Sequence, residues 1–344
     1  MSTNRKPKIS EIAELANVSP STVSKVINGR AGISEQTRSQ VEEALAKLGY
    51  SKPLVSTKVS QTIEIITEYI ENNGTIELIR HAAIWGKRHQ LGITVNQKDP
   101  DESLGDCLRQ IINRNPSGVI IQQFSKLSED DQALLDSRDI PWVIIDPVDV
   151  PDDNVNSVSV DNWTGGYQAT QYLVQQGHTR IGVISGLKQT QSAIARFSGY
   201  LAALRQAGIE YDSSITRESD YRSESGYQAA CSLLDMPNPP TAIFACNDLT
   251  AVNVYKAANE RGLELPRQLS VVGFDDVYPA AYLSPPLTTV EQPFGAIANA
   301  AVQMIMNIRA HKTVERHITL PTHLIVRDSV TAPLEHHDAG SANA

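Results

Sequence analysis

The chain has 344 residues, of which 41% are hydrophobic and 20% charged, a length that exceeds a usual single domain and allows a sizeable core, and its net charge is −9. Its longest apolar runs, such as Pro141 to Ile145, are too short to span a bilayer, and the polar start from Met1 to Lys8 lacks a signal-peptide pattern, so we expect a cytoplasmic protein. The three cysteines, Cys107, Cys231 and Cys246, are widely spaced, which favours reduced thiols over a disulfide or zinc framework.

The charge is unevenly distributed along the chain. Residues 1 to 62 carry nine Lys and Arg against five Glu, a net of +4, which leaves −13 on the remaining 282 residues. A local positive field on an acidic body can attract phosphates at one end while the rest stays soluble. The N-terminal segment is therefore the candidate for nucleic-acid contact.

Two short helices are predicted between Lys8 and Asn28, joined by a turn at Asn17-Val18. Ser19 suits the N-cap of the second helix because its hydroxyl can accept an orphan backbone N–H, and Pro20 suits the first helical position, which needs no donor. Apolar residues recur at three- and four-residue spacing and form one stripe per helix: Ile12, Leu15 and Ala16 on the first, and Val23, Val26 and Ile27 on the second. Two apolar stripes that bury each other give a helix-turn-helix unit whose second helix can lie in the DNA major groove.

A third helix is predicted from an N-cap at Ser34 to about Leu48, where Gly49 ends it. The whole segment reads I-x-x-I-A-x-x-A-x-V-S-x-x-T-V-S-K-V-I-N-G, then I-S-x-x-T-R-x-x-V and L-G-Y. This pattern resembles the head of the lactose-repressor (LacI/GalR) family of bacterial transcription regulators. The resemblance implies that residues 1–50 form a helix-turn-helix domain that binds double-stranded DNA. A three-helix protein-interaction module is the alternative, since such helix pairs alone do not prove DNA contact.

Carried over by position, the resemblance places Pro20, Ser21 and Lys25 on the base-reading face of the second helix. A lysine can donate to guanine O6 and N7, and Lys25 is polar on an otherwise apolar helix. Short hydroxyls and amides can bond phosphate oxygens, and the resemblance implies such contacts at Ser19, Thr22, Asn28, Ser34, Thr37 and Tyr50. For Ser19, Ser34 and Thr37, capping or packing is an equally weighted alternative.

Residues 51–62 are polar, with one Pro and no acid, which is typical of a linker. The resemblance implies a short hinge helix here whose Leu wedges into the minor groove. The expected A-R-x-L is missing, however, and β-branched residues such as Val55 and Val59 favour an extended chain. We therefore expect no ordinary hinge helix.

From residue 63 onward, short apolar runs alternate with helical patterns, which indicates parallel sheets covered by helices. The predicted strands are Ile63–Ile66, Ile93–Asn96, Gly118–Ile121, Trp142–Ile145, Val158–Val160, Ile181–Ile184, Thr241–Ala245 and Ser270–Gly273. The predicted helices are Thr75–His89, Asp101–Asn113, Asp130–Ser137, Thr164–Gln176, Ala193–Ala207, Ser223–Leu234, Leu249–Arg261 and Phe294–Arg309.

So many strands require two α/β lobes. We expect residues 63–331 to form a two-lobed, periplasmic-binding-protein-like core, an architecture that the resemblance also implies. The first lobe is expected at about 63–161 plus 293–320 and the second at about 162–292 plus 321–331, with the Ile318–Val326 stretch helping to complete both. Residues 332–344 are expected to be a disordered tail.

Ligands of open parallel sheets bind beyond the carboxyl ends of the strands. Acids and amides follow the predicted strands there, and Arg196 adds a bidentate donor, a set suited to hydroxyl-rich solutes. F-A-C-N-D and S-V-V-G-F-D-D also resemble effector-domain signatures of the family. Matching positions imply effector contacts at Asp146, Asp161, Arg196, Asn247 and Asp275, and further ones at Tyr221 and Gln292. An aromatic ring such as that of Tyr221 or Phe274 can stack on the apolar face of a sugar. Helix capping is the alternative for Asp161, and for Asp248 and Asp276 we weigh helix capping at least as highly as a role in the site.

These features predict a repressor controlled by a small molecule: a homodimer, or a tetramer, on a pseudo-palindromic operator. The expected effector is a sugar or oligosaccharide, with a purine or nucleoside as second choice. A transporter's solute-binding protein is the less favoured alternative, because the chain has a basic head and no secretion signal. Common catalytic motifs are missing and the histidines are scattered, so we expect no enzyme activity, no cofactor and no metal site.

Overall fold

A computed structural model of the chain describes residues 8–27, 33–48, 59–70, 73–99, 101–122, 127–221 and 223–334. Nearest the N-terminus lie three helices, α1 (Ile9–Leu15), α2 (Pro20–Ile27) and α3 (Glu35–Lys47). They share a core in which Ile12, Val23 and Val41 are fully buried. The prediction for Leu15 was wrong: its side chain is 50% exposed, because the buried stripe of α1 runs through Ile12, Ala13 and Ala16.

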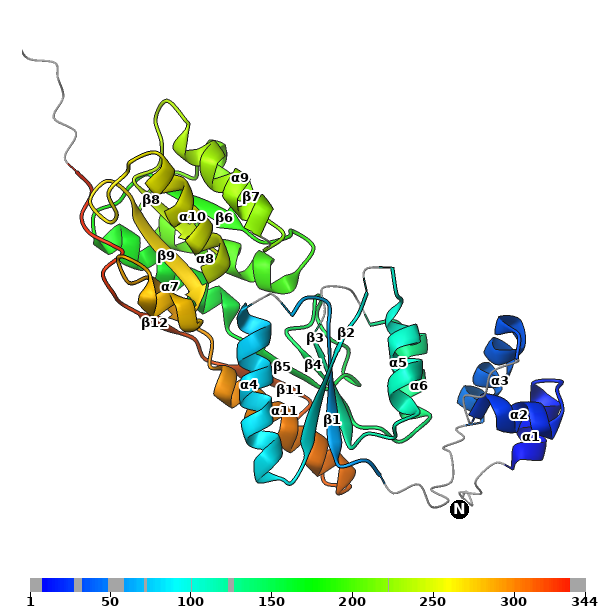
Figure 1. Cartoon of the computed structure of the whole chain (residues 1–344). Helices are drawn as coiled ribbons and strands as arrows, with labels where there is room; N and C mark the ends of the chain where they lie inside the picture. Colours follow the sequence, from blue (N-terminus) through cyan, green and yellow to red (C-terminus); the bar gives the residue numbers. More distant parts are fainter. Residues whose placement is uncertain are drawn as a thin grey trace, which may run out of the picture.

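The first lobe is built on a six-stranded sheet in the order β11-β5-β4-β3-β1-β2, with every pair parallel. Helices α4 and α11 cover one face and α5 and α6 the other (Figure 1). Its elements are β1 (Thr62–Thr67), α4 (Asn73–Arg88), β2 (Gly92–Gln97), α5 (Leu104–Ile112), β3 (Gly118–Gln122), α6 (Glu129–Asp136), β4 (Trp142–Ile145), β5 (Ser157–Val160), α11 (Phe294–Arg309) and β11 (His317–Leu320).

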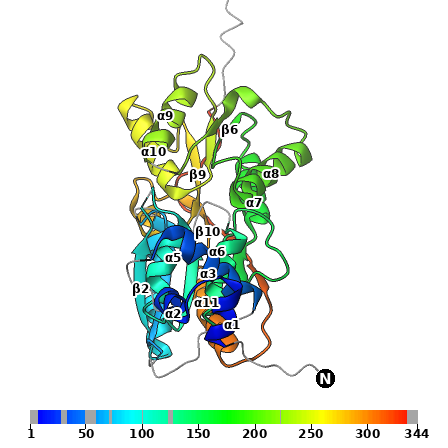
Figure 2. The same ribbon diagram turned by 90° about the vertical axis from the view of Figure 1, so that its right-hand side faces the viewer.

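The second lobe repeats this plan in the order β12-β10-β9-β8-β6-β7, with only β12 antiparallel to its neighbour among the strand pairs described. Figure 2 shows α7 and α8 on one side of the sheet and α9 and α10 on the other. Its elements are α7 (Asn162–Gln175), β6 (Ile181–Ser185), α8 (Gln191–Gln206), η1 (Ser213–Ile215), β7 (Thr216–Glu218), α9 (Ser223–Leu234), β8 (Ala242–Ala245), α10 (Asp248–Glu260), β9 (Ser270–Asp275), η2 (Tyr278–Tyr282), β10 (Thr288–Glu291) and β12 (His323–Ile325).

The mixed α/β fold with two parallel-dominated sheets confirms the predicted class. Strands β7 and β10 were missed, because β7 is only three residues long and the β10 segment is rich in threonine. The Ile318–Val326 stretch divides into β11 in the first sheet and β12 in the second. The chain thus passes between the lobes three times: between β5 and α7, between β10 and α11, and between β11 and β12.

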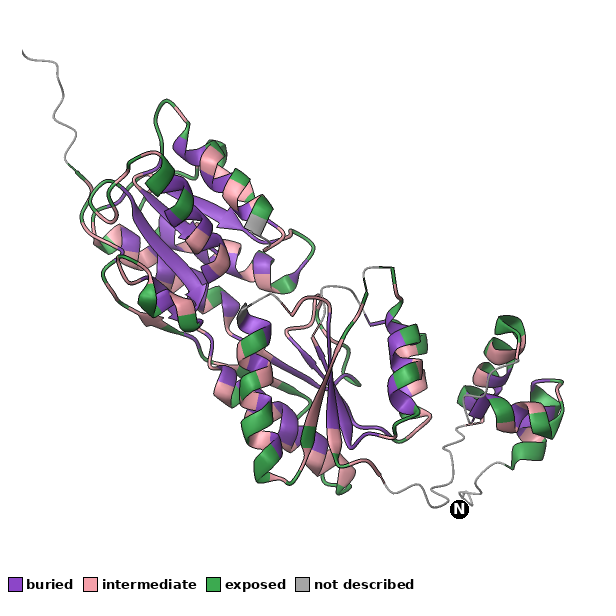
Figure 3. Cartoon of the chain, in the orientation of Figure 1, coloured by how far each residue is buried: buried purple, intermediate pink, exposed green. Residues whose placement is uncertain are grey.

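Burial follows the sheets, as Figure 3 shows: the central strands are buried and the outer faces of the helices are exposed. Within the described residues, no helix is both long and apolar enough to cross a bilayer. The expected linker lies largely outside the described residues, as do residues 335–344 of the expected tail. Thr331 next to that tail is ordered, since its N–H donates to the Ser270 hydroxyl.

Helices α7 and α8 cross at very close range, because each contributes a glycine that lies against the backbone of the other helix. A Cβ atom built on Gly166 would lie 2.1 Å from the carbonyl oxygen of Arg196, and one on Gly199 would lie 2.2 Å from that of Trp163. No side chain fits at such distances without moving a helix. This crossing sets the position of Arg196.

We predict that Gly166→Ala lowers the free energy of unfolding by more than about 2 kcal/mol, because the new methyl group must displace the α8 backbone. Gly92→Ala is the matched control: its Cβ would find its nearest neighbour at 3.5 Å, an ordinary contact, and the change should cost less than about 1 kcal/mol. Chemical denaturation of both variants measures the difference. Equal losses would contradict the close-crossing argument.

Candidate functional site

The start of α2 is organised by hydroxyl groups. The Ser19 Oγ accepts a hydrogen bond from the backbone N–H of Thr22 at 3.1 Å and lies 2.7 Å from the Ser21 Oγ. Ser34 caps α3 in the same way, accepting from the N–H of Thr37 at 3.2 Å. The capping alternative is therefore observed for both serines. Both remain exposed, so capping does not prevent contact with a phosphate.

The exposed face of α2 holds the three residues expected to read bases. Pro20, Ser21 and Lys25 are all exposed. The opposite face is buried against the other two helices. Thr22 and Thr37 are half-buried beside their capping serines, whereas Asn28 and Tyr50 lie outside the described residues.

A cleft with about 700 Å³ of empty volume opens between the two lobes. Its polar lining comes from strand ends, as parallel sheets predict. The first lobe contributes Gln122 at the end of β3 and Asp146 just after β4. The second lobe and the crossover after β10 contribute the rest: Thr190, Ser192, Arg196, Tyr221, Asn247, Asp275 and Gln292. The structure thus brings together six of the eight predicted effector residues.

Arg196 is the buried cation of this cleft, with 4% of its surface exposed. Its Nε donates to the Asn162 Oδ1 at 2.8 Å, and its Nη1 donates to the carbonyl oxygen of Cys246 at 2.6 Å. The same Nη1 lies 3.6 Å from an Asp275 carboxylate oxygen. The guanidinium also lies 3.7 Å from the centre of the Phe274 ring, a cation–π contact.

Two carboxyl groups share this cleft with the single guanidinium. Burial raises the pKa of Asp275 to about 6, although Arg196 and a 2.6 Å hydrogen bond donated by the Gln292 amide both favour the carboxylate. Burial also raises the pKa of Asp146. The cleft therefore suits an uncharged ligand and disfavours an anion.

Strained backbone conformations gather at the same cleft. The φ angles are +45° at Asp146, +62° at Tyr221 and +120° at Asp275, a region that residues with a Cβ rarely occupy. Such strain persists where the surroundings impose it, and it is concentrated at functional sites.

Two predicted effector residues do not line the cleft. Asp161 caps α7, with its carboxylate accepting from the N–H of Thr164 at 2.9 Å. Phe274 has no exposed surface, because it belongs to a buried core of the second lobe and Arg196 lies over its ring. Its ring packs against the guanidinium of Arg196.

Asp248 and Asp276 are not the helix caps that the sequence suggested. Asn247 caps α10 through its Oδ1, which accepts from the N–H of Thr250. The buried Asp248 carboxylate instead accepts from the Thr289 hydroxyl at 2.6 Å and from the Val277 N–H at 2.9 Å. Asp276 forms an ion pair with Arg327 at 2.7 Å.

Gln122 was missed by the sequence analysis, although it directly follows a predicted strand, which was the available signal. Its side-chain oxygen is buried and has no hydrogen-bond partner within the described part of the chain. The Tyr221 hydroxyl is in the same condition, and burial raises the pKa of that phenol, which keeps it protonated. Each of these two cleft-lining residues, one from each lobe, thus holds a buried polar atom without a partner among the described residues.

Among the described residues, no three His, Cys, Asp or Glu side chains gather closely enough to hold a metal ion. The described cysteines are free thiols, two of them buried.

A three-helix head joined to a two-lobed core with a polar cleft defines a ligand-responsive transcription regulator. Residues 8–52 match the bacterial regulatory proteins of the lacI family, and residues 170–330 match the periplasmic binding protein-like domain. The chain is 32% identical to the HTH-type transcriptional repressor PurR of Mannheimia succiniciproducens, over 94% of this chain and 98% of that protein. The chain belongs to the LacI family and is a DNA-binding transcriptional regulator.

Further relatives agree. The HTH-type transcriptional regulator CelR of Thermobifida fusca is 31% identical over 96% of this chain and 100% of its own. Among solved structures, a CelR-cellobiose complex matches with a TM-score of 0.71 and 28% identity, covering 94% of this chain and 100% of that one. The lac repressor dimer bound to operator and the anti-inducer ONPF matches with a TM-score of 0.69 and 26% identity, over 95% and 100% of the two chains.

The raised pKa of Asp275 predicts a pH dependence of stability. Its carboxyl binds a proton more tightly in the folded chain than in the unfolded chain, so its contribution to the free energy of unfolding falls as pH rises from about 4 to about 6 and then stays constant. Asp275→Asn lacks this titration. We compare the free energy of unfolding of the wild type with that of Asp275→Asn. The wild type minus the variant should be lower at about pH 7 than at about pH 4.5, by more than about 1 kcal/mol. Denaturation at both pH values tests this, and a pH-independent difference would refute it.

Proposed function

We propose that this regulator is a homodimeric repressor that binds a pseudo-palindromic operator through two heads and responds to an uncharged sugar or oligosaccharide in the cleft between its lobes. The observation that carries the effector proposal is the arrangement around Arg196. One guanidinium, two carboxyl groups and three amides line one cleft, which offers both donors and acceptors to a polyol.

The effector class is supported by charge and by likeness. Two carboxyl groups against one cation favour a neutral sugar over a phosphorylated one. One similar structure is a complex of CelR with cellobiose. A purine base or nucleoside is the second candidate, favoured by the aromatic ring of Tyr221 at the edge of the cleft.

An operator-release screen tests the effector proposal. The full chain is bound to labelled DNA from upstream of its own gene, and release is followed by fluorescence anisotropy on adding neutral sugars, their phosphates, purine bases and nucleosides. The proposal expects release by a neutral sugar, cellobiose included in the set, and none by its phosphate. Release by purines alone would replace the sugar with the second candidate. Absence of any sequence preference for DNA would contradict the repressor proposal itself.

We assign DNA contacts on the head according to the exposed face of α2. Pro20, Ser21 and Lys25 are proposed to face the bases of the major groove. The residues proposed to contact phosphates are Ser19, Thr22, Asn28, Ser34, Thr37 and Tyr50.

Lys25→Gln tests this assignment. Loss of a base contact should weaken binding to the specific operator by tenfold to hundredfold, roughly 1–3 kcal/mol, and reduce preference over random DNA. Arg205→Gln, which removes one exposed charge from α8 in the second lobe, is the control and should leave binding unchanged. A Lys25→Gln variant that weakens specific and random DNA equally would place Lys25 on the phosphates.

The dimer is proposed to form through exposed apolar side chains of the core. On α4, Ile76 and Ile84 are 45% and 43% exposed. On η2, Tyr278 and Tyr282 are each 71% exposed, and their ring centres lie 4.8 Å apart. Exposed apolar groups of this size, gathered on single elements, are typical of interfaces.

Tyr282→Asp should therefore weaken dimerisation more than tenfold, because it brings a charge into a buried apolar contact. Analytical ultracentrifugation of the full chain measures the dissociation constant. Leu334→Asp, at a side chain 53% exposed near the end of the described chain, is the control with the same new charge. A variant that dimerises like the wild type would exclude η2 from the interface.

A further inference from the structure

One edge of the first lobe receives the chain that comes from the head. The strands of this sheet all run in one direction, so their starts lie along a single edge. Strand β1 begins there with Thr62, directly after the predicted linker. The helices that cross back over the sheet end at the same edge, as Figure 1 shows for α4 and α11. We call this surface the linker edge.

The linker edge carries a group of basic residues. Lys87 and Arg88 lie in the last turn of α4, and Arg309 lies in the last turn of α11. Lys312 and Arg316 lie on the segment between α11 and β11. Arg309 is half-buried and the other four are exposed. We call Lys87, Arg88, Lys312 and Arg316 the linker-edge cations.

Within the described chain, the linker-edge cations form no ion pair with a carboxylate. The guanidinium of Arg88 lies 4.2 Å from the centre of the Trp85 ring, and the Arg316 Nη1 donates to the carbonyl oxygen of Asn154 at 2.9 Å. Both contacts position a charge without neutralising it. Three exposed acids share the edge: Asp136, Asp139 and Glu315.

The second lobe shows that helix dipoles alone do not account for these cations. Cations near helix ends complement the dipole in any helix. Yet α7, α9 and α10, as far as the structure describes them, have no Lys or Arg in their last turns. Three arginines near the corresponding edge of that lobe are ion-paired: Arg180 with Asp212, Arg261 with Asp235, and Arg267 with Glu264. The unpaired group is a feature of the first lobe.

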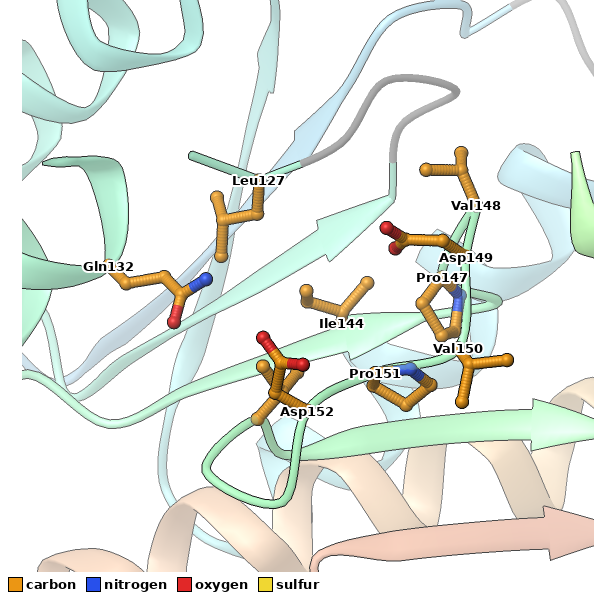
Figure 4. Close-up of a pocket in the computed structure, with 10 residues that line it drawn as sticks. Leu127, Gln132, Ile144, Pro147, Val148, Asp149, Val150, Pro151 and Asp152 are labelled. Atoms are coloured by element: carbon orange, nitrogen blue, oxygen red, sulfur yellow. The ribbon is translucent and has the colours of Figure 1, made fainter. Parts of the chain in front are cut away.

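The opposite edge of the first lobe is acidic. Glu129, Asp130 and Asp131 lie in the first turn of α6. Figure 4 shows two further acids, Asp149 and Asp152, on the loop that follows β4. The charges of the lobe are therefore separated, with acids toward the cleft and the linker-edge cations toward the head, in a chain of net charge −9. A polyanion held by the head meets the basic edge first.

Hydrogen bonds tie this edge to the end of the linker. The Arg309 Nη1 donates to the carbonyl oxygen of Ser117 at 3.2 Å, and the Ser117 hydroxyl donates to the carbonyl oxygen of Ser60 at 2.8 Å. The chain between Leu48 of the head and Val59 can span about 40 Å at most. A duplex bound by the head is therefore kept near the linker edge.

We propose that the linker edge is a second DNA-contacting surface, at which Lys87, Arg88, Lys312 and Arg316 bind phosphates of the duplex that the heads hold. Phosphate contacts carry no sequence information, so the edge adds affinity for any duplex and leaves the choice of operator to the head. The inference rests on DNA binding by the head and is independent of the proposed sugar response.

Salt dependence tests the proposal, because each phosphate contact adds about 0.9 to the slope of log affinity against log salt concentration. Lys312→Gln/Arg316→Gln removes two cations from each protomer of the full chain. Fluorescence anisotropy with DNA from upstream of its own gene, and with random DNA of equal length, should give a slope shallower by at least about 1 on both. The preference for operator should not change. A slope equal to that of the wild type would overturn the proposal.

Two further double variants serve as a repeat and a control. Lys87→Gln/Arg88→Gln, at the end of α4, should flatten the slope as the first pair does. Arg205→Gln/Lys256→Gln removes the same charge from exposed positions of the second lobe and should leave the slope unchanged. Equal flattening in all three would reduce the effect to net charge and refute the edge. A wild type without operator preference would instead contradict the repressor proposal.

Lysine acetylation followed by peptide mass spectrometry locates the contact. Operator DNA should slow the acetylation of Lys87 and Lys312 at least about threefold. The rate at Lys188, whose side chain is 80% exposed on the second lobe, should stay the same. Equal rates with and without DNA at the two edge lysines would exclude the contact. Protection of the edge lysines by polyglutamate but not by DNA would assign the edge to an acidic protein and overturn the proposal.

Discussion

A buried cation must have its charge and its N–H groups satisfied, or the fold cannot retain it. Arg196 meets this requirement with groups from separate parts of the second lobe: Asn162 at the start of α7, Cys246 after β8 and Asp275 at the end of β9. Phe274, a buried residue of β9, makes a cation–π contact with the guanidinium. Arg196 thus connects α7 with the ends of β8 and β9, at the edge of the sheet where the cleft opens. Asp275 also accepts a hydrogen bond from the Gln292 amide. The interactions of Arg196 therefore extend through Asp275 to the crossover between β10 and α11.

The position of Arg196 depends on two glycines, and its proposed role depends on movement between the two lobes. Gly166 and Gly199 let α7 and α8 approach until backbone meets backbone, which a side chain at either position would prevent. Three crossings of the chain join the lobes, so the lobes can change their relative position without breaking either sheet. Gln122 and Asp146 face the cleft from one lobe and Arg196 and Tyr221 from the other. In the proposed mechanism, a ligand that bonds both sets stabilises the closed arrangement in proportion to its preference for that state.

The sequence carried most of the fold and part of the site. Continuous apolar runs such as Val143–Ile145 mark strands buried on both faces, and this signal does not depend on distant contacts. The three-residue β7 and the division of Ile318–Val326 between two sheets depend on tertiary pairing, which a local pattern does not contain. Strand-end logic found the acids of the cleft but did not show that Phe274 is fully buried, because its burial depends on Arg196 and on the core that packs against its ring. Gln122 showed the same strand-end signal as Asp146 and was overlooked. The effector and DNA roles of all these residues stay predictions.

The role proposed for the Arg196 cluster is to read the effector while the head reads DNA. Its most direct test is an operator-binding titration of Arg196→Met, in full-length protein, with and without the ligand that releases the wild type. When no ligand is present, the variant is expected to bind operator as the wild type does. Its release is expected to require at least about a hundredfold more ligand, since a charged hydrogen-bond donor to the ligand is gone. Release of the folded variant at the wild-type ligand concentration would show that Arg196 does not read the effector.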